Sequence, residues 1–299
     1  MTKLRSPLFS IDAHGRVGQD LLFTTGKTGK LAKKNPVPTG PTSWPQIYHR
    51  WLYQDYALLW TEIPQATRDT WNALAAGTTR SGFNLFMQDR LTTLPDIAAW
   101  WHLDGIGGAA APDSSLNGNH GTITGSQAVP FIFNNGLLSD GLTDRIDVPH
   151  STSLNIGNDD VYTVETIVRF ETLPDSAFFS KYDDFGPLYY PFYLATFGAY
   201  FFFLVKDTAG NTIQFYGYPY ALKTPYRIAL VREQTLVRFY INGFEVANVT
   251  NPLILDCSNP NPIYFATTAF YFSNVTSDET IIWTRALSPA AILMHAERK

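Results

Sequence analysis

Acidic side chains on one strand offer the first chemistry to consider, the cleavage of a glycosidic bond. Hydrolysis with retention needs a nucleophile and a general acid whose carboxyl groups lie about 5 Å apart. Glu165 and Glu171 share the parity of one expected strand, but six residues of strand rise separate them by roughly 20 Å. No other expected strand carries two acids at a suitable spacing. The sequence therefore favours a protein that is not an enzyme.

Histidine, serine and cysteine give no stronger catalytic pattern. No two histidines have a metal-binding spacing, and nothing in the chain indicates a Ser-His-Asp arrangement. Cys257 is the single cysteine, which excludes an intrachain disulfide and is typical of a small buried apolar side chain. The six histidines are scattered, at His14, His49, His102, His120, His150 and His295.

A tyrosine-rich region offers a surface that could bind sugars, since a tyrosine presents both an apolar ring and a hydroxyl. Nine aromatic residues lie between Tyr189 and Phe203, and this density is equally typical of a core or an intersubunit surface. Residues 201–205 (FFFLV) are apolar throughout, so both faces of that strand need cover. We expect another chain or the helical region to cover it, with a sugar platform as the alternative. The candidate sugar-binding residues are Tyr189, Tyr190, Tyr193, Tyr216, Tyr218 and Tyr220.

A cluster of lysines lies near the N-terminus. The string GKT at 26–28 resembles the end of a phosphate-binding loop, but that motif needs a glycine where Leu21 stands. Lysines also suit phosphate groups of nucleic acids, yet no stacking platform or nucleic-acid-binding fold accompanies them. We expect these lysines to dock against a protein partner, and we expect no nucleic acid. The candidate partner-binding residues are Lys27, Lys30, Lys33 and Lys34.

The clearest structural pattern lies in residues 226–246 (YRIALVREQTLVRFYINGFEV), which belong to the part of the chain that must position the candidate binding residues. Ile228 and Leu230 share one face, and Val237, Phe239 and Ile241 share another, which is the period of two typical of half-buried strands. The dipeptide NG at 242–243 tolerates positive φ at both centres of a tight hairpin turn. The pattern therefore predicts an antiparallel β-meander.

The chain divides by composition into three parts. Closely spaced glycines and prolines predict an extended basic arm over residues 1–43, with a short strand or hairpin around 17–24. Helical spacings predict a small module of three helices over 44–95, with Trp44, Trp51, Trp60 and Trp71 in its core. Short alternating runs between turn-rich loops predict a β-sandwich over 96–299.

Charge and hydropathy limit the setting. Residues 1–95 carry 11 Lys/Arg against 6 Asp/Glu, which leaves 11 against 20 for the remainder. The two parts therefore differ in their electrostatic roles. The longest apolar run, at 200–205, falls short of the roughly 20 residues that a membrane helix needs, and the N-terminus shows no signal peptide. We therefore expect no membrane partner.

Ordered sequence blocks in residues 100–299 carry a family resemblance. They are WHLDG, DSSLNGNHGTITG, FNNGLLSDGLTDRIDVPHSTSLNIG, YTVETIVRF, FSKYD, RIALVRE with VRFYINGFEVA, and WTRALSPAAI. This order resembles that of laminin-G-like domains of the concanavalin A-like lectin and glucanase superfamily. The resemblance implies a mainly β fold, a two-sheet antiparallel jelly-roll sandwich preceded by the arm and the helical module.

The same resemblance implies a calcium site and a role in carbohydrate binding, which is frequent in this superfamily. In related sandwiches a calcium ion lies between an early loop and an acidic side chain before the final strand. By this resemblance Asp278 would supply a carboxylate and Gly141 a carbonyl, with Asp140 or Asp144 nearby. Hard oxygen ligands suit calcium, although such acids also commonly cap turns.

Residues 1–95 contain a run of glycines, lysines and prolines followed by TRDTWNALA and SGFNLFM. Through these features they resemble short structural proteins of tailed bacteriophages. The two resemblances together lead us to expect a virion structural protein, such as a capsid decoration, fibre or tail component. Residues 1–95 would bind other virion proteins, and the sandwich, as a homo-oligomer, would project outward and bind host-surface glycans. The alternatives are a carbohydrate-binding module without structural role and, less favoured, a polysaccharide hydrolase.

Overall fold

The chain forms two compact units, residues 1–50 and 51–299. In the first unit, only the backbone is described before residue 43, and it forms a three-stranded antiparallel sheet in the order β1, β2, β3. The strands are β1 (Gly15–Val17), β2 (Leu21–Gly26) and β3 (Gly29–Lys34). The computed structural model describes residues 15–17, 21–26, 29–34, 43–105, 108–157, 161–173, 175–182, 187–268 and 271–298.

The N-terminal sheet is more regular than the extended arm that the sequence predicted. Glycines flank its β2–β3 hairpin, in which Gly26 pairs with Gly29, and the hairpin lies close to the one expected around 17–24. The glycine content led us to expect too little strand pairing in this region, because glycine weakens a β-strand without preventing it. The boundaries predicted at 43/44 and 95/96 stay predictions, while the compact units divide at 50/51.

Three helices follow, as the periodicity predicted: α1 (Trp44–Glu62), α2 (Gln65–Ala75) and α3 (Gly82–Thr93). Ser81 caps α3 by accepting a hydrogen bond from the N–H of Asn84 at 3.2 Å. A fourth helix, α4 (Pro289–Ala296), begins after Ser288, which accepts from the N–H of Ala291. No described helix is long and apolar enough to cross a membrane.

The tryptophans do not share one helical core. Trp60 and Trp71 pack on Phe86, with ring centroids 5.2 and 5.7 Å apart. Trp51 instead packs against Phe133 of the sandwich at 4.7 Å. From Trp51 onward, α1 thus belongs to the same compact unit as the β-domain.

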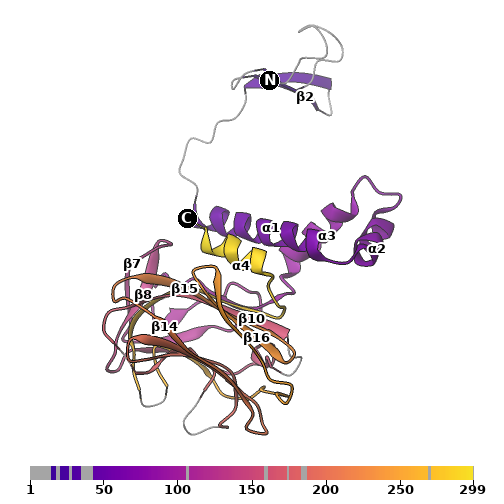
Figure 1. The fold of residues 1–299 in the computed structure, drawn as a ribbon. Helices are drawn as coiled ribbons and strands as arrows, with labels where there is room; N and C mark the ends of the chain where they lie inside the picture. Colours follow the sequence, from indigo (N-terminus) through magenta and orange to yellow (C-terminus); the bar gives the residue numbers. More distant parts are fainter. Residues whose placement is uncertain are drawn as a thin grey trace. The chain divides into compact units, whose positions relative to one another are not determined.

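The sandwich consists of two antiparallel sheets (Figure 1). Sheet 1 has the described order β17-β16-β15-β10-β19-β8-β7, and β4 also pairs with β19. Sheet 1 contains β4 (Ile97–Trp101), β7 (Gln127–Pro130), β8 (Asn135–Asp140), β10 (Val161–Phe170), β15 (Pro225–Glu233), β16 (Leu236–Ile241), β17 (Phe244–Thr250) and β19 (Asn274–Trp283).

Sheet 2 has the described order β14-β13-β12-β11-β18-β9-β6-β5. A short 3-10 helix, η1 (Thr152–Leu154), lies between β9 and β10. Sheet 2 contains β5 (Ala110–Ala111), β6 (Gly121–Thr124), β9 (Arg145–Val148), β11 (Ala177–Ser180), β12 (Tyr190–Phe197), β13 (Tyr200–Lys206), β14 (Thr212–Pro219) and β18 (Ile263–Phe265).

The predicted meander is confirmed as β15, β16 and β17. Val237, Phe239 and Ile241 all face the core, and Phe239 meets Phe203 of sheet 2 with ring centroids 5.4 Å apart. Asn242 and Gly243 have φ of 52° and 86°, as a tight hairpin turn requires. The alternation therefore set both the strand faces and the turn.

The outer face of sheet 1 carries α1 and α4. Figure 1 shows α4 lying along α1 beside the strands of this sheet, and Gly243 in the β16–β17 turn lies under α4. These two helices therefore cover one layer of the sandwich, sheet 1.

Candidate functional site

A groove lies on the outer face of sheet 2, over β12, β13 and β14, with a cavity volume of about 540 Å³. Its middle row is set by strand register, which places Ala195 opposite Phe202 and Phe202 opposite Tyr216. Tyr193 and Phe197 stand two residues to either side of Ala195 and share its face. The small alanine between larger side chains hollows the sheet surface at this point.

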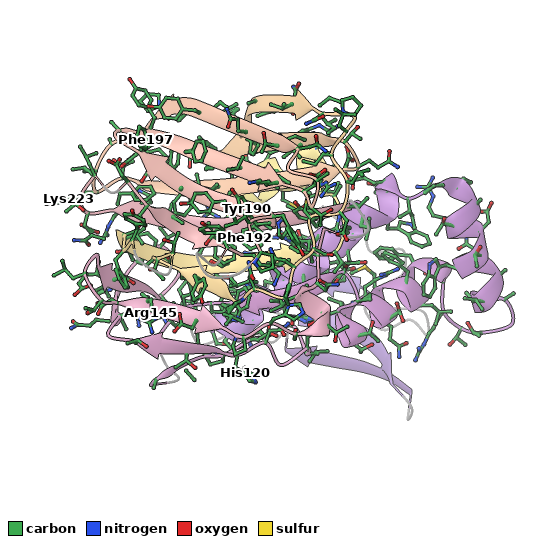
Figure 2. All side chains as sticks on the ribbon, turned by 90° about the horizontal axis from the view of Figure 1, so that it is seen from below. His120, Arg145, Tyr190, Phe192, Phe197 and Lys223 are labelled. Atoms are coloured by element: carbon green, nitrogen blue, oxygen red, sulfur yellow. The ribbon has the colours of Figure 1, made fainter. Side chains whose placement is uncertain are left out.

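The groove is lined by aromatic rings that water reaches. Phe197 is 61% exposed and Tyr216 54% exposed, and their ring centroids lie 6.2 Å apart. Tyr193 and Phe202 form a second pair at 6.3 Å. Figure 2 shows Phe197 near one end of the strand that also carries Phe192 and Tyr190. Exposed aromatic groups gathered in a hollow mark a binding surface.

The apolar run at 201–205 explains how β13 serves both layers. Phe201, Phe203 and Val205 are fully buried in the core, whereas Phe202 and Leu204 are half-buried on the outer face. The expectation that the helical region covers this outer face is wrong, because α1 and α4 lie on sheet 1 while α2 and α3 pack on each other. Cover by another chain stays a prediction.

Polar groups stand at the rim of the groove. Asp175 is exposed, and its Oδ1 accepts a hydrogen bond from the N–H of Gly198 in the β12–β13 turn. Gln214 is exposed on β14 and lines the groove with the ring of Tyr216. Ser176 lies deeper and donates to the carbonyl of Tyr271 at 2.7 Å. The site thus combines an apolar floor with hydrogen-bonding edges.

The tyrosines named from the sequence separate into lining and structural groups. Tyr193 and Tyr216 line the groove. Tyr220 is only 6% exposed, and its hydroxyl donates to the carbonyl of Gly198 at 3.0 Å. Tyr190 is also buried, and burial raises its pKa to about 12.

The other two candidates lie outside the groove lining. Tyr218 is 41% exposed with φ of 44°, and its ring centroid lies 6.5 Å from that of Phe201. Tyr189 is half-buried, and its carbonyl accepts a hydrogen bond from Asn259. The sequence analysis missed the remaining lining residues, which are Asp175, Ser176, Ala195, Thr196, Phe197, Phe202 and Gln214. Their signal was the parity of Phe197, Phe202 and Ala195 relative to the core residues.

The carboxylates predicted to hold calcium are only partly brought together. Asp140 and Asp144 close a loop around Gly141, in which Asp140 Oδ1 accepts from the N–H groups of Leu142, Thr143 and Asp144 at 2.7, 3.0 and 3.1 Å. These backbone hydrogen bonds, that of Thr143 first, lower the pKa of Asp140. The pattern is that of a turn cap.

Asp278 lies apart from that loop. Asp140 pairs with Asn274 on β19, and Asp278 stands four residues farther on, about 13 Å by strand rise. Its carboxylate accepts from the N–H of Phe133 at 3.3 Å and of Glu279 at 2.8 Å. Burial, followed by the nearby Glu279, raises the pKa of Asp278 to about 9. Among the described residues no His, Cys, Asp or Glu group suits a metal ion, and calcium binding stays a prediction.

One of the scattered histidines, His295, belongs to a buried cluster of charged side chains on the inner side of α4. Nε2 of His295 donates to Asp55 Oδ1 at 2.5 Å, and Nδ1 donates to Glu165 Oε2 at 2.9 Å. Burial alone would lower the pKa of His295, but Asp55 and then Glu165 outweigh it and raise that pKa. Since each ring nitrogen faces a different carboxylate, the three groups form an ion cluster and not a metal site.

Glu165 and Glu171, the two acids considered for hydrolysis, lie outside the groove. Glu165 is held by His295 and by Trp283 Nε1 at 2.8 Å, under the helices. Glu171 follows β10 and pairs with Arg169 Nε at 2.6 Å. The predicted partner-binding lysines Lys30, Lys33 and Lys34 lie on β3, and Lys27 lies outside the described residues.

Comparison with known proteins agrees with this architecture. A model of the concanavalin A-like lectin/glucanases superfamily, of the laminin G type, matches residues 139–293, just over half of the 299-residue chain. The chain belongs to that superfamily. Its name covers sugar-binding and sugar-cleaving proteins, so membership alone does not define the activity. No curated protein sequence matches the chain detectably.

Solved structures show the same fold at low sequence identity. The binding domain of Paraclostridial Mosquitocidal Protein 1 is similar with a TM-score of 0.57 and 16% identity, over 67% of this chain and 52% of that one. Domain 4 of the extracellular arabinanase AbnA from Geobacillus stearothermophilus, in complex with arabinotriose, has a TM-score of 0.53 and 18% identity, over 68% and 98%.

A third similar structure is the botulinum neurotoxin serotype D ligand binding domain in complex with N-acetylneuraminic acid. Its TM-score is 0.56 at 11% identity, over 68% of this chain and 50% of that one. The alignments thus extend over about half the length of the two toxin domains. At these identities the comparisons establish the fold of the sandwich.

Proposed function

We propose that this protein is a non-catalytic glycan-binding protein whose binding site is the groove on sheet 2. The observation that carries the proposal is the aromatic lining of a cavity of about 540 Å³. A sugar ring has an apolar face of C–H groups and a rim of hydroxyls. Phe197 and Tyr216 offer ring surface for the first, and Gln214 and Asp175 offer amide and carboxylate groups for the second.

The distribution of acids supports binding over cleavage. Among the described residues that line the groove, Asp175 is the one carboxylate. Hydrolysis with retention or inversion typically requires two carboxyl groups on opposite sides of the scissile bond. Glu165 and Glu171 are engaged by His295 and Arg169 outside the groove. A captured glycan would therefore be held without being cut.

The comparisons add support at the level of the fold. One similar structure holds arabinotriose and another holds N-acetylneuraminic acid. This jelly-roll therefore occurs in proteins that carry sugars, although their positions on the fold do not transfer at 18% and 11% identity.

A glycan array probed with the full chain tests the proposal. We expect saturable binding to a subset of glycans, lost in Tyr216→Ala and in Phe197→Ala. Phe244→Ala is the matched control, because Phe244 is a similarly exposed aromatic, at 69%, on β17 of the other sheet. Silence across the array, or binding that survives both groove substitutions, would contradict the proposal.

The same variants separate a sugar from a second copy of the chain as the occupant. If the groove joined two copies, sedimentation would show an oligomer of the parent chain that dissociates in Tyr216→Ala. We expect Tyr216→Ala to leave the sedimentation behaviour of the chain unchanged. The homo-oligomer predicted from the sequence would then have to use another surface.

The attachment of the protein to a virion remains a second proposal. Its support is that residues 1–50 form a compact unit separate from 51–299, with three lysines on its edge strand β3. The chain would then be a particle component that displays the sandwich for host-surface glycans. Co-sedimentation of the full chain, but not of residues 51–299, with phage particles tests this role.

A further inference from the structure

We infer that the groove selects neutral glycans and rejects anionic ones. This inference rests on the proposed function and adds the class of ligand. It comes from the charges around the groove, where Asp175 is the one charged side chain among the described lining residues. The rest of that lining is aromatic, aliphatic, hydroxyl or amide.

No cation among the described residues forms an ion pair with the carboxylate of Asp175. Its Oδ1 accepts one backbone hydrogen bond, from Gly198, and no ion pair joins it to another described residue. Asp175 is exposed and lines the groove, so its carboxylate is in contact with any ligand held there. An acidic sugar in the groove would meet this charge directly.

The described basic residues on this face lie outside the groove lining or are engaged. Lys206 does not line the groove and stands two residues, about 7 Å by strand rise, beyond Leu204, which pairs with the lining residues Tyr193 and Gln214. Arg145 on β9 pairs with Asp147 at 2.9 Å, and β11 and β18 separate β9 from β12. Figure 2 shows Arg145 on the far strands of the sheet from Phe197.

Lys223 is the remaining basic residue to consider. Figure 2 places it at the same end of the molecule as Phe197. It follows β14 in the loop before β15, where its N–H donates to the carbonyl of Phe170, and it does not line the groove. It therefore enters the experiment as a separate variant.

The physical consequence is selection by repulsion. A carboxylate or sulfate bound in the groove would lose part of its hydration without gaining a cationic partner, and it would lie beside a like charge. Two like charges several ångströms apart in a partly hydrated site weaken binding by about 5- to 10-fold. A neutral sugar can instead donate its hydroxyls to the Asp175 carboxylate. The similar structures hold both kinds of sugar, so the choice depends on the groove itself.

Matched glycan pairs test the inference with the intact chain. Each pair consists of a galactose-terminated oligosaccharide and the same oligosaccharide carrying terminal N-acetylneuraminic acid. We expect the neutral member to bind about 5- to 10-fold more tightly at low salt, and the ratio to shrink at 0.5 M salt. Asp175→Asn retains an acceptor for Gly198 and should bring the ratio close to one, mainly by improving the acidic member. Asp69→Asn on α2, an exposed acid elsewhere, and Lys223→Ala should leave the ratio unchanged.

The outcomes distinguish this inference from the proposed function. Equal or tighter binding of the sialylated members overturns the inference while the glycan-binding role stands. The inference is also overturned if the ratio of neutral to sialylated affinity is the same in Asp175→Asn as in the parent chain. Tighter binding of a free-amine sugar than of its N-acetylated counterpart would assign the groove to cations and overturn neutral selection. If neither member of any pair binds, the proposed function itself is overturned.

Discussion

Replacing His295 with alanine should strongly destabilise the unit formed by residues 51–299. The imidazolium lies between the carboxylates of Asp55 and Glu165, and all three side chains are buried or nearly so. Arg298 would still pair with Asp55, at 2.7 Å, whereas Glu165 would lose its ion pair and keep the hydrogen bond from Trp283 and the more distant charge of Arg298. Removing one partner of a buried ion pair typically costs about 3–5 kcal/mol.

Urea denaturation of the full chain, followed by tryptophan fluorescence, measures this cost. For a unit of this size, a loss of about 3–5 kcal/mol corresponds to a Tm lower by roughly 10 °C. Leu293→Ala is the matched control, since Leu293 lies on the same helix and is 40% exposed. It should cost less than about 1 kcal/mol.

The result that would refute this reasoning is a His295→Ala variant within about 1 kcal/mol of the parent chain. Such a result would mean that α4 is held by apolar contacts alone. A double-mutant cycle with Asp55→Asn adds a second check, because two groups in one network should show a coupling of about 1–3 kcal/mol. Additive effects would contradict the pairing.

Three further predictions concern the same unit. Asp278→Asn should raise stability at pH 8 and change it little at pH 4, because burial raises the pKa of Asp278 to about 9; a Tm difference that does not grow with pH would contradict this. Gly243→Ala should cost about 1–2 kcal/mol, since φ is +86° and a Cβ would lie 2.8 Å from that of Ala296; unchanged urea unfolding would show that the turn relaxes. Trp51→Ala should cost about 3–5 kcal/mol, because its ring packs 4.7 Å from Phe133; a near-neutral calorimetric Tm would indicate that α1 does not depend on this contact.

The pKa shifts also fix how stability varies with pH. The raised pKa of His295 gives a contribution that is complete below its ordinary value of 6.5 and is lost as pH rises through the folded-state value. The lowered pKa values of Asp55 and Glu165 give contributions present above 3.8 and 4.5, respectively, which are lost on acidification. The raised pKa of Asp278 makes the folded state more stable at acidic pH, and this contribution is lost as the pH rises towards 9. Together these four groups favour the folded state at acidic over alkaline pH.

The sequence predicted the sandwich well because strand alternation and turn chemistry are local signals. The meander ending at Asn242 and Gly243 needed no tertiary information, and the superfamily match at residues 139–293 agrees with the resemblance stated from sequence blocks. The start of the last strand was harder to place, because β19 begins at Asn274 and includes Asp278 and Glu279. Asp278 and Glu279 resemble turn residues, and only tertiary contacts explain why they lie buried within a strand.

The candidate site was less predictable than the fold. A tyrosine in a strand can face the core or the solvent, and an irregularity can shift the alternation. Tyr190 and Tyr193 differ in parity, yet the register shift between them brings their ring centroids to 5.8 Å. Tyr220 belongs to the core side, whereas Tyr216 faces the groove. The His295 cluster joins residues more than 100 positions apart, and no spacing along the chain could have indicated it.

Direct titration of a glycan into the full chain tests the central claim, that the sheet 2 groove holds sugar. The ligand is the strongest neutral oligosaccharide from the array, and the comparison is between the parent chain, Tyr216→Ala and Phe244→Ala. We expect saturable binding that weakens more than about tenfold, equivalent to about 1.4 kcal/mol, only when Tyr216 is removed. Equal affinities for all three proteins would contradict it.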